Sequence, residues 1–219
     1  ASIAHEVRNP LGAISHASQL LRESITVNED DKRMIEIILD HCNRVNLIIE
    51  DVLDASRHDD TTANVIDLEA WITGFINNYK STHELCDDIQ LQMDTSDVKV
   101  KVIEGQLEQV LNNLFDNGLR YSFKNTGDAT LLIQIGMENN DGDEQPFIHI
   151  IDDGPGIGEE DESRLFEPFH TTESSGTGLG LYISKELCEA NQSQLVYGRT
   201  PSGKSSFSIF FGNPDRVMS

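Results

Sequence analysis

Residues 1–57 carry an apolar stripe that is too wide for two helices to bury against each other. The segment has helical periodicity on both sides of a break near Ser24 to Asp30. In a heptad register, position a holds Val7, Ile14, Leu21, Ile38, Val45 and Val52, position d holds Ile3, Pro10, Ala17, Met34, His41, Ile48 and Ala55, and position e of the second helix holds Ile35, Cys42 and Ile49. Because two such hairpins packed as a four-helix bundle cover all three columns, we expect residues 1–57 to form a homodimer.

The rest of the chain mixes helical and strand periods. Residues 58–66 are polar and aperiodic, which is typical of a linker, and residues 67–219 are expected to form a second domain. In that domain the pattern predicts helices near 67–82, 105–123 and 178–191, and strands near 89–93, 98–102, 130–138, 146–151, 194–197 and 205–211. Since these elements interleave without a regular βαβ rhythm, the sequence favours a two-layer α+β sandwich over a parallel doubly wound sheet.

Charge and composition exclude several classes of protein. The net charge is −22, and residues 58–219 hold 10 basic and 28 acidic side chains, so direct binding of nucleic acid is not expected. Three cysteines without a C-x-x-C pair favour a reducing cytoplasm over a disulfide framework or a thiolate zinc site. No apolar run approaches the roughly 18 residues of a membrane span, and the first residues do not resemble a signal peptide. We therefore expect an internal fragment of a longer protein.

His5 is the first candidate for chemistry. The heptad register puts it at position f, on the side away from the apolar stripe, with Glu6 next to it and Asn9 one helical turn on. A carboxylate that keeps one imidazole nitrogen protonated leaves the other neutral and nucleophilic. An isolated exposed histidine is more often a solvated surface residue. A zinc protease motif is excluded, because H-E-x-x-H requires histidine where this chain has Asn9.

A second group of candidates lies on the predicted helix 105–123 and at the end of the strand 146–151. Asn113 and Asn117 are four residues apart, so they project from one helix face, where amide oxygens suit a hard cation such as Mg²⁺. Arg120 lies nearby and offers donors to phosphate oxygens. Asp152 ends an apolar strand before a glycine-rich turn, in a position to accept a hydrogen bond from the amino group of a base.

Glycine-rich segments complete this pattern. Gly154, Gly156 and Gly158 follow Asp152, and Gly176, Gly178 and Gly180 open a helix, where backbone N–H groups can approach a phosphate. Each of these features alone is more often a turn, a helix cap or a flexible loop. Their combination in this order and spacing predicts a nucleotide site.

One tempting motif is rejected. Residues 198–205 satisfy the G-x-x-x-x-G-K-[ST] pattern of a phosphate-binding loop. Residues 206–211 alternate like a strand, whereas a phosphate-binding loop must lead into a helix. The segment is therefore interpreted as a hairpin turn.

With these motifs in place, the chain resembles a bacterial two-component sensor histidine kinase over nearly its whole length. Residues 2–11 are similar to the phosphoacceptor box of that family, residues 113–121 to its N box, residues 152–158 and 176–181 to its two glycine boxes, and residues 166–169 to its F box. A weaker similarity of the N-terminal segment and residues 67–71 points to the sensor kinases that govern type IV pilus genes.

The resemblance implies a dimeric phosphotransfer bundle followed by an ATP-binding domain of the gyrase, chaperone and histidine-kinase type. It implies that His5 is phosphorylated, that Glu6 orients and deprotonates it, and that Asn9 positions water when phosphate is removed from the partner. It further implies that Asn117 holds Mg²⁺. The implied ATP-binding residues are Asn113, Asn117, Arg120, Tyr121, Asp152, Gly154, Gly156, Ile157, Phe169, Thr177, Gly178, Leu179, Gly180 and Leu181.

The implied partner is the receiver domain of a response regulator, and the implied location is cytoplasmic, with membrane attachment only through a missing N-terminal sensor region. The chain departs from the family pattern at Gly118, where alanine is usual, at Arg120, where lysine is common, and at Glu173, where a lysine often faces the phosphates. Two alternatives remain open: an ATP-driven clamp or chaperone of the same fold, and a dimeric scaffold that no longer turns over ATP.

Overall fold

The structure is a computed structural model that describes residues 2–23, 29–57, 62–83, 88–95, 98–140, 143–173 and 176–212. The chain divides into two compact units. One contains residues 1–57 and 167–180, and the other contains residues 58–166 and 181–219.

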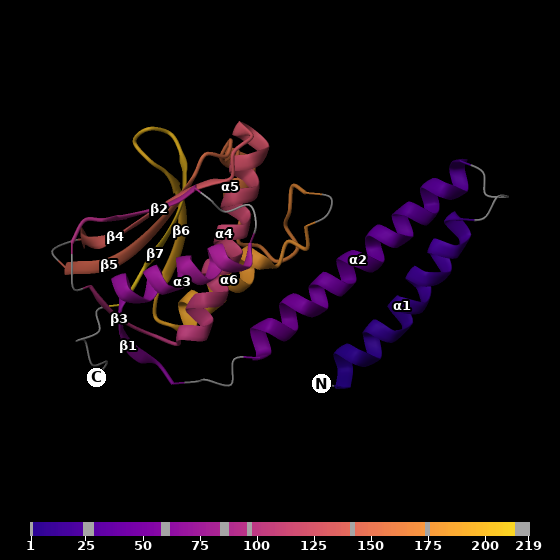
Figure 1. Cartoon of the computed structure of the whole chain (residues 1–219), viewed down its shortest axis with the longest axis horizontal. Coiled ribbons are helices and arrows are strands. Elements are labelled where there is room, and N and C mark those ends of the chain that lie inside the picture. Colours follow the sequence, from indigo (N-terminus) through magenta and orange to yellow (C-terminus); the bar gives the residue numbers. More distant parts are fainter. Residues whose placement is uncertain are drawn as a thin grey trace. The chain divides into compact units, whose positions relative to one another are not determined.

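The N-terminal segment is a helical hairpin of α1 (Ser2–Arg22) and α2 (Glu29–Arg57) (Figure 1). The two predicted helices are confirmed, and α2 begins inside the expected break; residues 24–28 lie outside the described residues. The helix α1 runs through Pro10. Among the described helices, none combines the length and apolar character that crossing a bilayer requires.

The hairpin buries only part of its apolar stripe. Ile35, Leu39 and Cys42 of α2 are buried, together with Ser18 of α1. Side chains predicted at positions a and d remain 42 to 58% exposed, namely Ile14, Leu21, Met34 and Ile38. A single hairpin therefore leaves apolar surface uncovered, as the width of the stripe indicates. The pairing of two hairpins stays a prediction.

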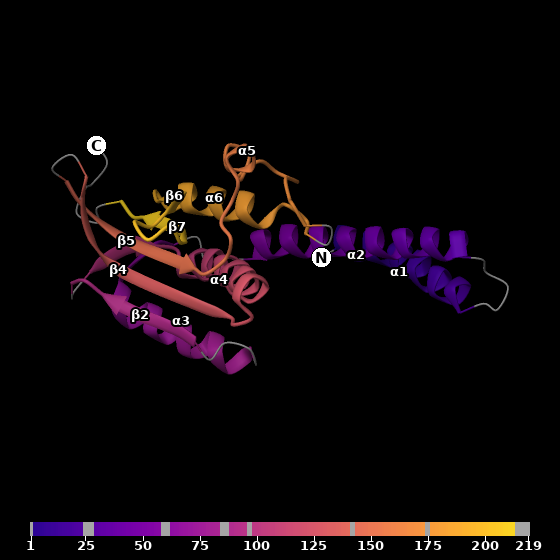
Figure 2. The same ribbon diagram turned by 90° about the horizontal axis from the view of Figure 1, so that it is seen from above.

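The second unit contains a five-stranded mixed sheet (Figures 1 and 2). Its strands lie in the order β2-β4-β5-β7-β6, with β2 and β4 parallel and the other neighbours antiparallel. A separate antiparallel pair joins β1 and β3. The bounds are β1 (Asn64–Asp67), α3 (Leu68–Thr82), β2 (Asp88–Met93), β3 (Lys99–Val102), α4 (Glu104–Thr126), β4 (Thr130–Asn140), β5 (Asp143–Asp152), α5 (Glu159–Glu162), α6 (Gly180–Ala190), β6 (Gln194–Arg199) and β7 (Ser205–Phe210).

Most predicted elements are present within a few residues of their expected bounds. Two are additional. Residues 64–66, which fall in the expected linker, belong to β1, and α5 lies in a segment expected to be loop. The segment Asn64–Asp67 is too short to show a reliable period, and α5 contains only acidic residues, so it has no apolar face. The rejected phosphate-binding loop is confirmed as a hairpin turn between β6 and β7, with Gly203 at a φ of 86°.

The core lies between one face of the sheet and the helices α3, α4 and α6. Leu131, Ile133 and Ile135 of β4 alternate toward the helices and are buried. The buried residues of α4 recur at three and four residue steps: Leu107, Val110, Leu111, Leu114, Phe115, Gly118, Leu119 and Ser122. The predicted order of a helical hairpin followed by a two-layer α+β sandwich is thus confirmed.

Glu104 joins three elements at the start of α4. One carboxylate oxygen accepts a hydrogen bond from Trp71 Nε1 at 3.1 Å, and the other accepts from Asn64 Nδ2 at 3.3 Å. Asp67 ends β1 and caps α3 by accepting the N–H of Ala70 at 2.9 Å. The strand β1, which overlaps the end of the expected linker, is therefore tied to both α3 and α4.

An aromatic cluster fastens α3 to α4. The ring of Phe115 is fully buried and meets Phe75 and Tyr79 edge-on, with centroid distances of 5.1 and 5.3 Å. Trp71, the only tryptophan of the chain, stacks on Phe75 at 5.8 Å. Its fluorescence therefore reports on this packing.

We expect Phe115→Ala to destabilise the second unit by about 3 to 5 kcal/mol, because it removes a buried ring and leaves a cavity. Phe123→Ala is the matched control on the same helix, since Phe123 is 55% exposed, and it should cost less than about 0.5 kcal/mol. Urea unfolding followed by Trp71 fluorescence measures both changes. Similar losses in the two variants would contradict the assigned core.

Candidate functional site

The polar residues predicted on α4 form one connected row beside its buried stripe. Asn113 Nδ2 donates to Ser184 Oγ of α6 at 2.8 Å, and Asn117 Nδ2 donates to Asn113 Oδ1 at 3.3 Å. Arg120 Nη2 donates to Asn117 Oδ1 at 2.7 Å. The Asn117 carbonyl oxygen therefore faces a cationic group. An amide oxygen is a type of ligand that Mg²⁺ prefers, but a metal could bind this one only if Arg120 moved away from it.

Positive charge gathers at the next turn of α4. The Arg120 guanidinium lies 5.2 Å from the centroid of the Tyr121 ring, and the Lys124 ammonium lies 5.6 Å from it. In a chain of net charge −22, this turn is a local concentration of cationic donors.

Asp152 is a buried carboxyl group at the end of a central strand. It is 5% exposed and lies opposite Leu131 of β4 and Ser205 of β7. Burial raises the pKa of Asp152, although hydrogen bonds from the Gly154 N–H and the Ser205 side chain act to lower it. The Gly154 N–H donates to Asp152 Oδ1 at 2.8 Å. The carboxyl group is thus a fixed, buried acceptor suited to an amino group on a base.

Two glycines allow α4 and the loop after β5 to lie close to Asp152. A Cβ on Gly118 would be 2.6 Å from Leu131 Cδ2 and 3.4 Å from Asp152 Cβ. A Cβ on Gly154 would be 2.6 Å from Asp152 Oδ1 and 2.9 Å from Tyr121 Cβ. The structure therefore brings Tyr121, Asp152 and Gly154 together. An alanine at position 118 would require Leu131 to move.

Gly156 and Ile157 lie further along the same loop. Gly156 has a φ of 74°, in the left-handed region that favours glycine. Ile157 is partly buried and packs against the core cluster. Both predicted residues therefore belong to the second unit, on the loop that begins at Asp152.

In the segment before α6, residues 169 and 178 are brought together. The Phe169 N–H donates to the Gly178 carbonyl at 2.9 Å, and both residues have positive φ values, 66° and 72°. A Cβ on Gly178 would be 2.5 Å from the Phe169 carbonyl carbon. Thr177 Oγ1 accepts the Leu179 N–H at 3.2 Å, just before α6 begins at Gly180. Phe169 is 59% exposed, whereas Leu179 is buried. Leu181 follows in α6.

His5, Glu6 and Asn9 lie on α1. Their side chains are outside the described residues, so the predicted outward direction of His5 stays a prediction.

Sequence reasoning missed the residues that fix the start of the loop after β5. Asp153 accepts from Thr130 Oγ1 at 2.8 Å and lies 2.6 Å from Lys204 Nζ, and these contacts lower the pKa of Asp153. The Ser122 hydroxyl accepts the Asp153 N–H at 2.9 Å. These partners come from α4, β4 and the turn before β7. No local motif signals them, because only the fold brings them together.

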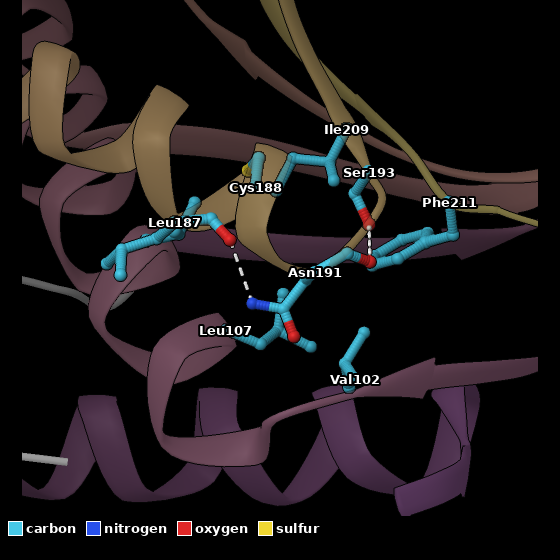
Figure 3. Close-up of a pocket in the computed structure, with 9 residues that line it drawn as sticks. Val102, Leu107, Leu187, Cys188, Asn191, Ser193, Ile209 and Phe211 are labelled. Carbon is cyan, nitrogen blue, oxygen red and sulfur yellow. Dashed lines mark hydrogen bonds between the residues drawn. The ribbon is translucent and has the colours of Figure 1, made fainter. Parts of the chain in front are cut away.

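A small pocket outside this site is lined mainly by apolar side chains (Figure 3). Asn191 is among the lining residues, and its Oδ1 accepts the Ile103 N–H at 2.7 Å while its Nδ2 donates to the Leu187 carbonyl at 2.8 Å. Burial raises the pKa of Cys188 in its wall to about 12, so the thiol stays protonated. Across the described residues, no group of three or more His, Cys, Asp or Glu side chains is placed to hold a metal.

The buried charge of Asp152 gives a test. Its folded-state pKa is raised, so the carboxylate destabilises the fold above that pKa, and the penalty disappears as the pH falls through it toward 3.8. We expect Asp152→Asn without ligand to be more stable than the parent at pH 7, with a difference that narrows toward pH 4. Thermal unfolding across this pH range measures the difference, and a less stable variant at pH 7 would refute the burial cost.

Comparisons with known proteins match both units. Residues 103–214 match the family model of histidine kinase-, DNA gyrase B- and HSP90-like ATPases, and residues 1–61 match that of the His kinase A phospho-acceptor domain. The sensor protein kinase PilS of Pseudomonas aeruginosa is 42% identical over 217 residues, which cover 99% of this chain and 41% of PilS. The chain thus spans about two fifths of that relative. The resemblance to sensor histidine kinases, including those that regulate pili, is confirmed.

Solved structures share the fold. Full-length ShkA in complex with AMPPNP superposes with a TM-score of 0.62 at 20% identity, over 96% of this chain and 44% of ShkA. The histidine kinase AdeS of Acinetobacter baumannii gives a TM-score of 0.60 at 23% identity, over 98% of this chain and 100% of AdeS. At these identities the likeness concerns the fold, a helical hairpin followed by the α+β sandwich.

Proposed function

We propose a phosphoryl-transfer function on the premise that this chain belongs to the sensor histidine kinase family. It binds Mg²⁺-ATP and moves the γ-phosphoryl group onto its own His5, from which an aspartate of a response regulator receives it. The observation that carries the proposal is the buried Asp152 carboxyl group, held by Gly154 beside Tyr121.

Base recognition falls to Asp152. Its carboxyl group accepts a hydrogen bond from the exocyclic amino group of adenine, and the loop that carries Gly154, Gly156 and Ile157 lies beside the ring. A buried acceptor that already receives one N–H has a free direction for a second donor, and it disfavours a carbonyl at the same place. AMPPNP, an ATP analogue, is bound by the structural neighbour ShkA, which supports ATP as the ligand of this fold.

The phosphates face the row of α4. Asn117 would hold Mg²⁺ through Oδ1, with Asn113 fixing the orientation of its amide. Arg120, which donates to that oxygen in this structure, would turn from it to the phosphate oxygens when the nucleotide and metal bind. Bound Mg²⁺ supplies charge neutralisation for the phosphoryl group in transit. The segment before α6 and the first residues of α6 are proposed to contribute backbone N–H groups and side chains to the phosphates, through Phe169, Thr177, Gly178, Leu179, Gly180 and Leu181.

His5 is the nucleophile. A neutral imidazole nitrogen forms the bond to the γ-phosphorus as the bond to the ADP oxygen breaks, and Glu6 takes the imidazole proton. Asn9 positions a water molecule when the same helix face dephosphorylates the response regulator. The chain thereby acts in both directions.

After incubation with Mg²⁺ and ATP labelled at the γ-phosphate, we expect label on the protein that is stable in alkali and labile in acid. His5→Gln should abolish it, because no other residue of the phosphoacceptor box offers an imidazole. His16→Gln, an exposed histidine of the same helix, is the control and should incorporate normally. Unchanged labelling of the His5 variant would overturn the proposal.

We propose that the acting species is a homodimer formed through residues 1–57. The uncovered apolar side chains Ile14, Leu21, Met34 and Ile38 support this, because a second hairpin can cover them. Of the expected linker 58–66 and ATP-binding domain 67–219, we propose that residues 64–66 belong to the domain, because they form β1, and that the linker ends before Asn64. The partner is a receiver domain, and the site of action is the cytoplasm, with any membrane attachment in a sensor region outside this chain.

Nucleotide binding separates the kinase from an inert scaffold. We expect Mg²⁺-ADP to raise the melting temperature of the parent chain by several degrees when it is about 100-fold above its Kd, because a ligand bound only to the native state stabilises it. Asp152→Asn should lose this shift while it still folds. No shift in the parent chain would favour a scaffold, and ATP hydrolysis without label on the protein would favour a clamp ATPase.

A further inference from the structure

The strand β6 holds both backbone groups of Ile157, which lies on the loop after β5. The Ile157 N–H donates to the Tyr197 hydroxyl at 2.9 Å. The Ile157 carbonyl accepts from Arg199 Nη2 at 3.2 Å. Tyr197 and Arg199 are two residues apart, so they project from the same side of β6. The loop and the edge strand are therefore joined although β7 lies between β5 and β6.

Arg199 is itself oriented by the hairpin turn. Its Nη1 donates to the Gly203 carbonyl at 3.2 Å, while Nη2 reaches the loop. A planar guanidinium that donates in two directions acts as a rigid bridge between the turn and Ile157. The tyrosine ring has a support of its own, since it packs against Phe207 of β7 at a centroid distance of 5.2 Å.

The guanidinium also covers Gly156. A Cβ at this position would be 2.5 to 2.7 Å from the Nη2, Nη1 and Cζ atoms of Arg199. The backbone of Gly156 has a positive φ as well. The two constraints act together: glycine allows the turn of the loop, and Arg199 packs directly against the space that a side chain would take.

The same hairpin holds the beginning of the loop. Lys204 Nζ lies 2.6 Å from Asp153 Oδ1, and Ser205 is the register partner of Asp152. One hairpin thus fixes both ends of residues 153–157. Between these ends the loop contains Gly154 and Gly156. Without the contacts to the hairpin, these glycines would give the backbone many accessible conformations.

We propose that Tyr197 and Arg199 are positioning residues of the nucleotide site, which hold the loop 153–157 in the conformation that receives the base. This inference rests on the proposed ATP-binding function. A loop ordered before binding loses less conformational entropy when the nucleotide arrives, so the hairpin raises affinity without touching the ligand. The rate constant of phosphoryl transfer from the bound nucleotide does not depend on these two residues.

The test compares Tyr197→Phe and Arg199→Met with two controls in the whole chain. Tyr182→Phe removes a hydroxyl from α6, and Ser202→Ala changes the turn without removing a contact to the loop. Titration calorimetry with Mg²⁺-ADP and Mg²⁺-AMPPNP gives Kd, and labelling kinetics give KM and kcat. Tyr197→Phe and Arg199→Met should each bind both nucleotides about 3- to 10-fold more weakly, as expected for one lost hydrogen bond to the loop, with KM raised and kcat unchanged. The controls should match the parent.

Binding of adenosine distinguishes positioning from a direct phosphate contact. If Arg199 acts on the loop, Arg199→Met should weaken adenosine, ADP and AMPPNP by the same factor, and Arg199→Lys should recover little, because it lacks the planar bridge. Unchanged affinity in both Tyr197→Phe and Arg199→Met, or a loss of affinity confined to the phosphorylated ligands, would overturn the inference. If the parent chain fails to bind any of these ligands, the proposed function is the part that is wrong.

Discussion

The second unit is organised around a carboxyl group that is costly to bury. Asp152 lies at the end of β5 between two paired strands, with α4 close above it because position 118 is glycine. Removing a carboxylate from water disfavours the charged form, and only two hydrogen-bond donors oppose this effect. Such a residue persists where it gives something other than stability, in this case a directed acceptor inside an otherwise apolar layer.

The helix α4 serves packing and chemistry on adjacent faces. Its buried stripe fills the core against β4 and β5, and the row that starts at Asn113 lies beside this stripe. Because Asn113 is fixed to Ser184 of α6, the direction of the amides depends on how two helices pack. A substitution in the core would therefore change the direction of these amides although the amides themselves stay the same.

Local patterns predicted the long elements and the residues of the family motifs, because helical and strand periods are properties of short windows. They did not predict β1, whose four residues are too few to define a period, or α5, which has no apolar side chain. The contacts of Ile157 with Tyr197 and Arg199 span about 40 residues and follow only from strand order. The spacing of Tyr197 and Arg199 along β6 shows that they lie on the same side of the strand, but it does not show which residues they contact.

The carboxylate of Glu104 has a practical consequence for dividing the chain. It binds Asn64 on one side and Trp71 on the other, so the short strand after the polar stretch is held by the first residue of α4. A catalytic fragment cut at residue 67 loses this strand and leaves β3 as an open edge prone to association. A shorter fragment for expression should therefore begin upstream of Asn64, even though the sequence there has the polar composition of a linker.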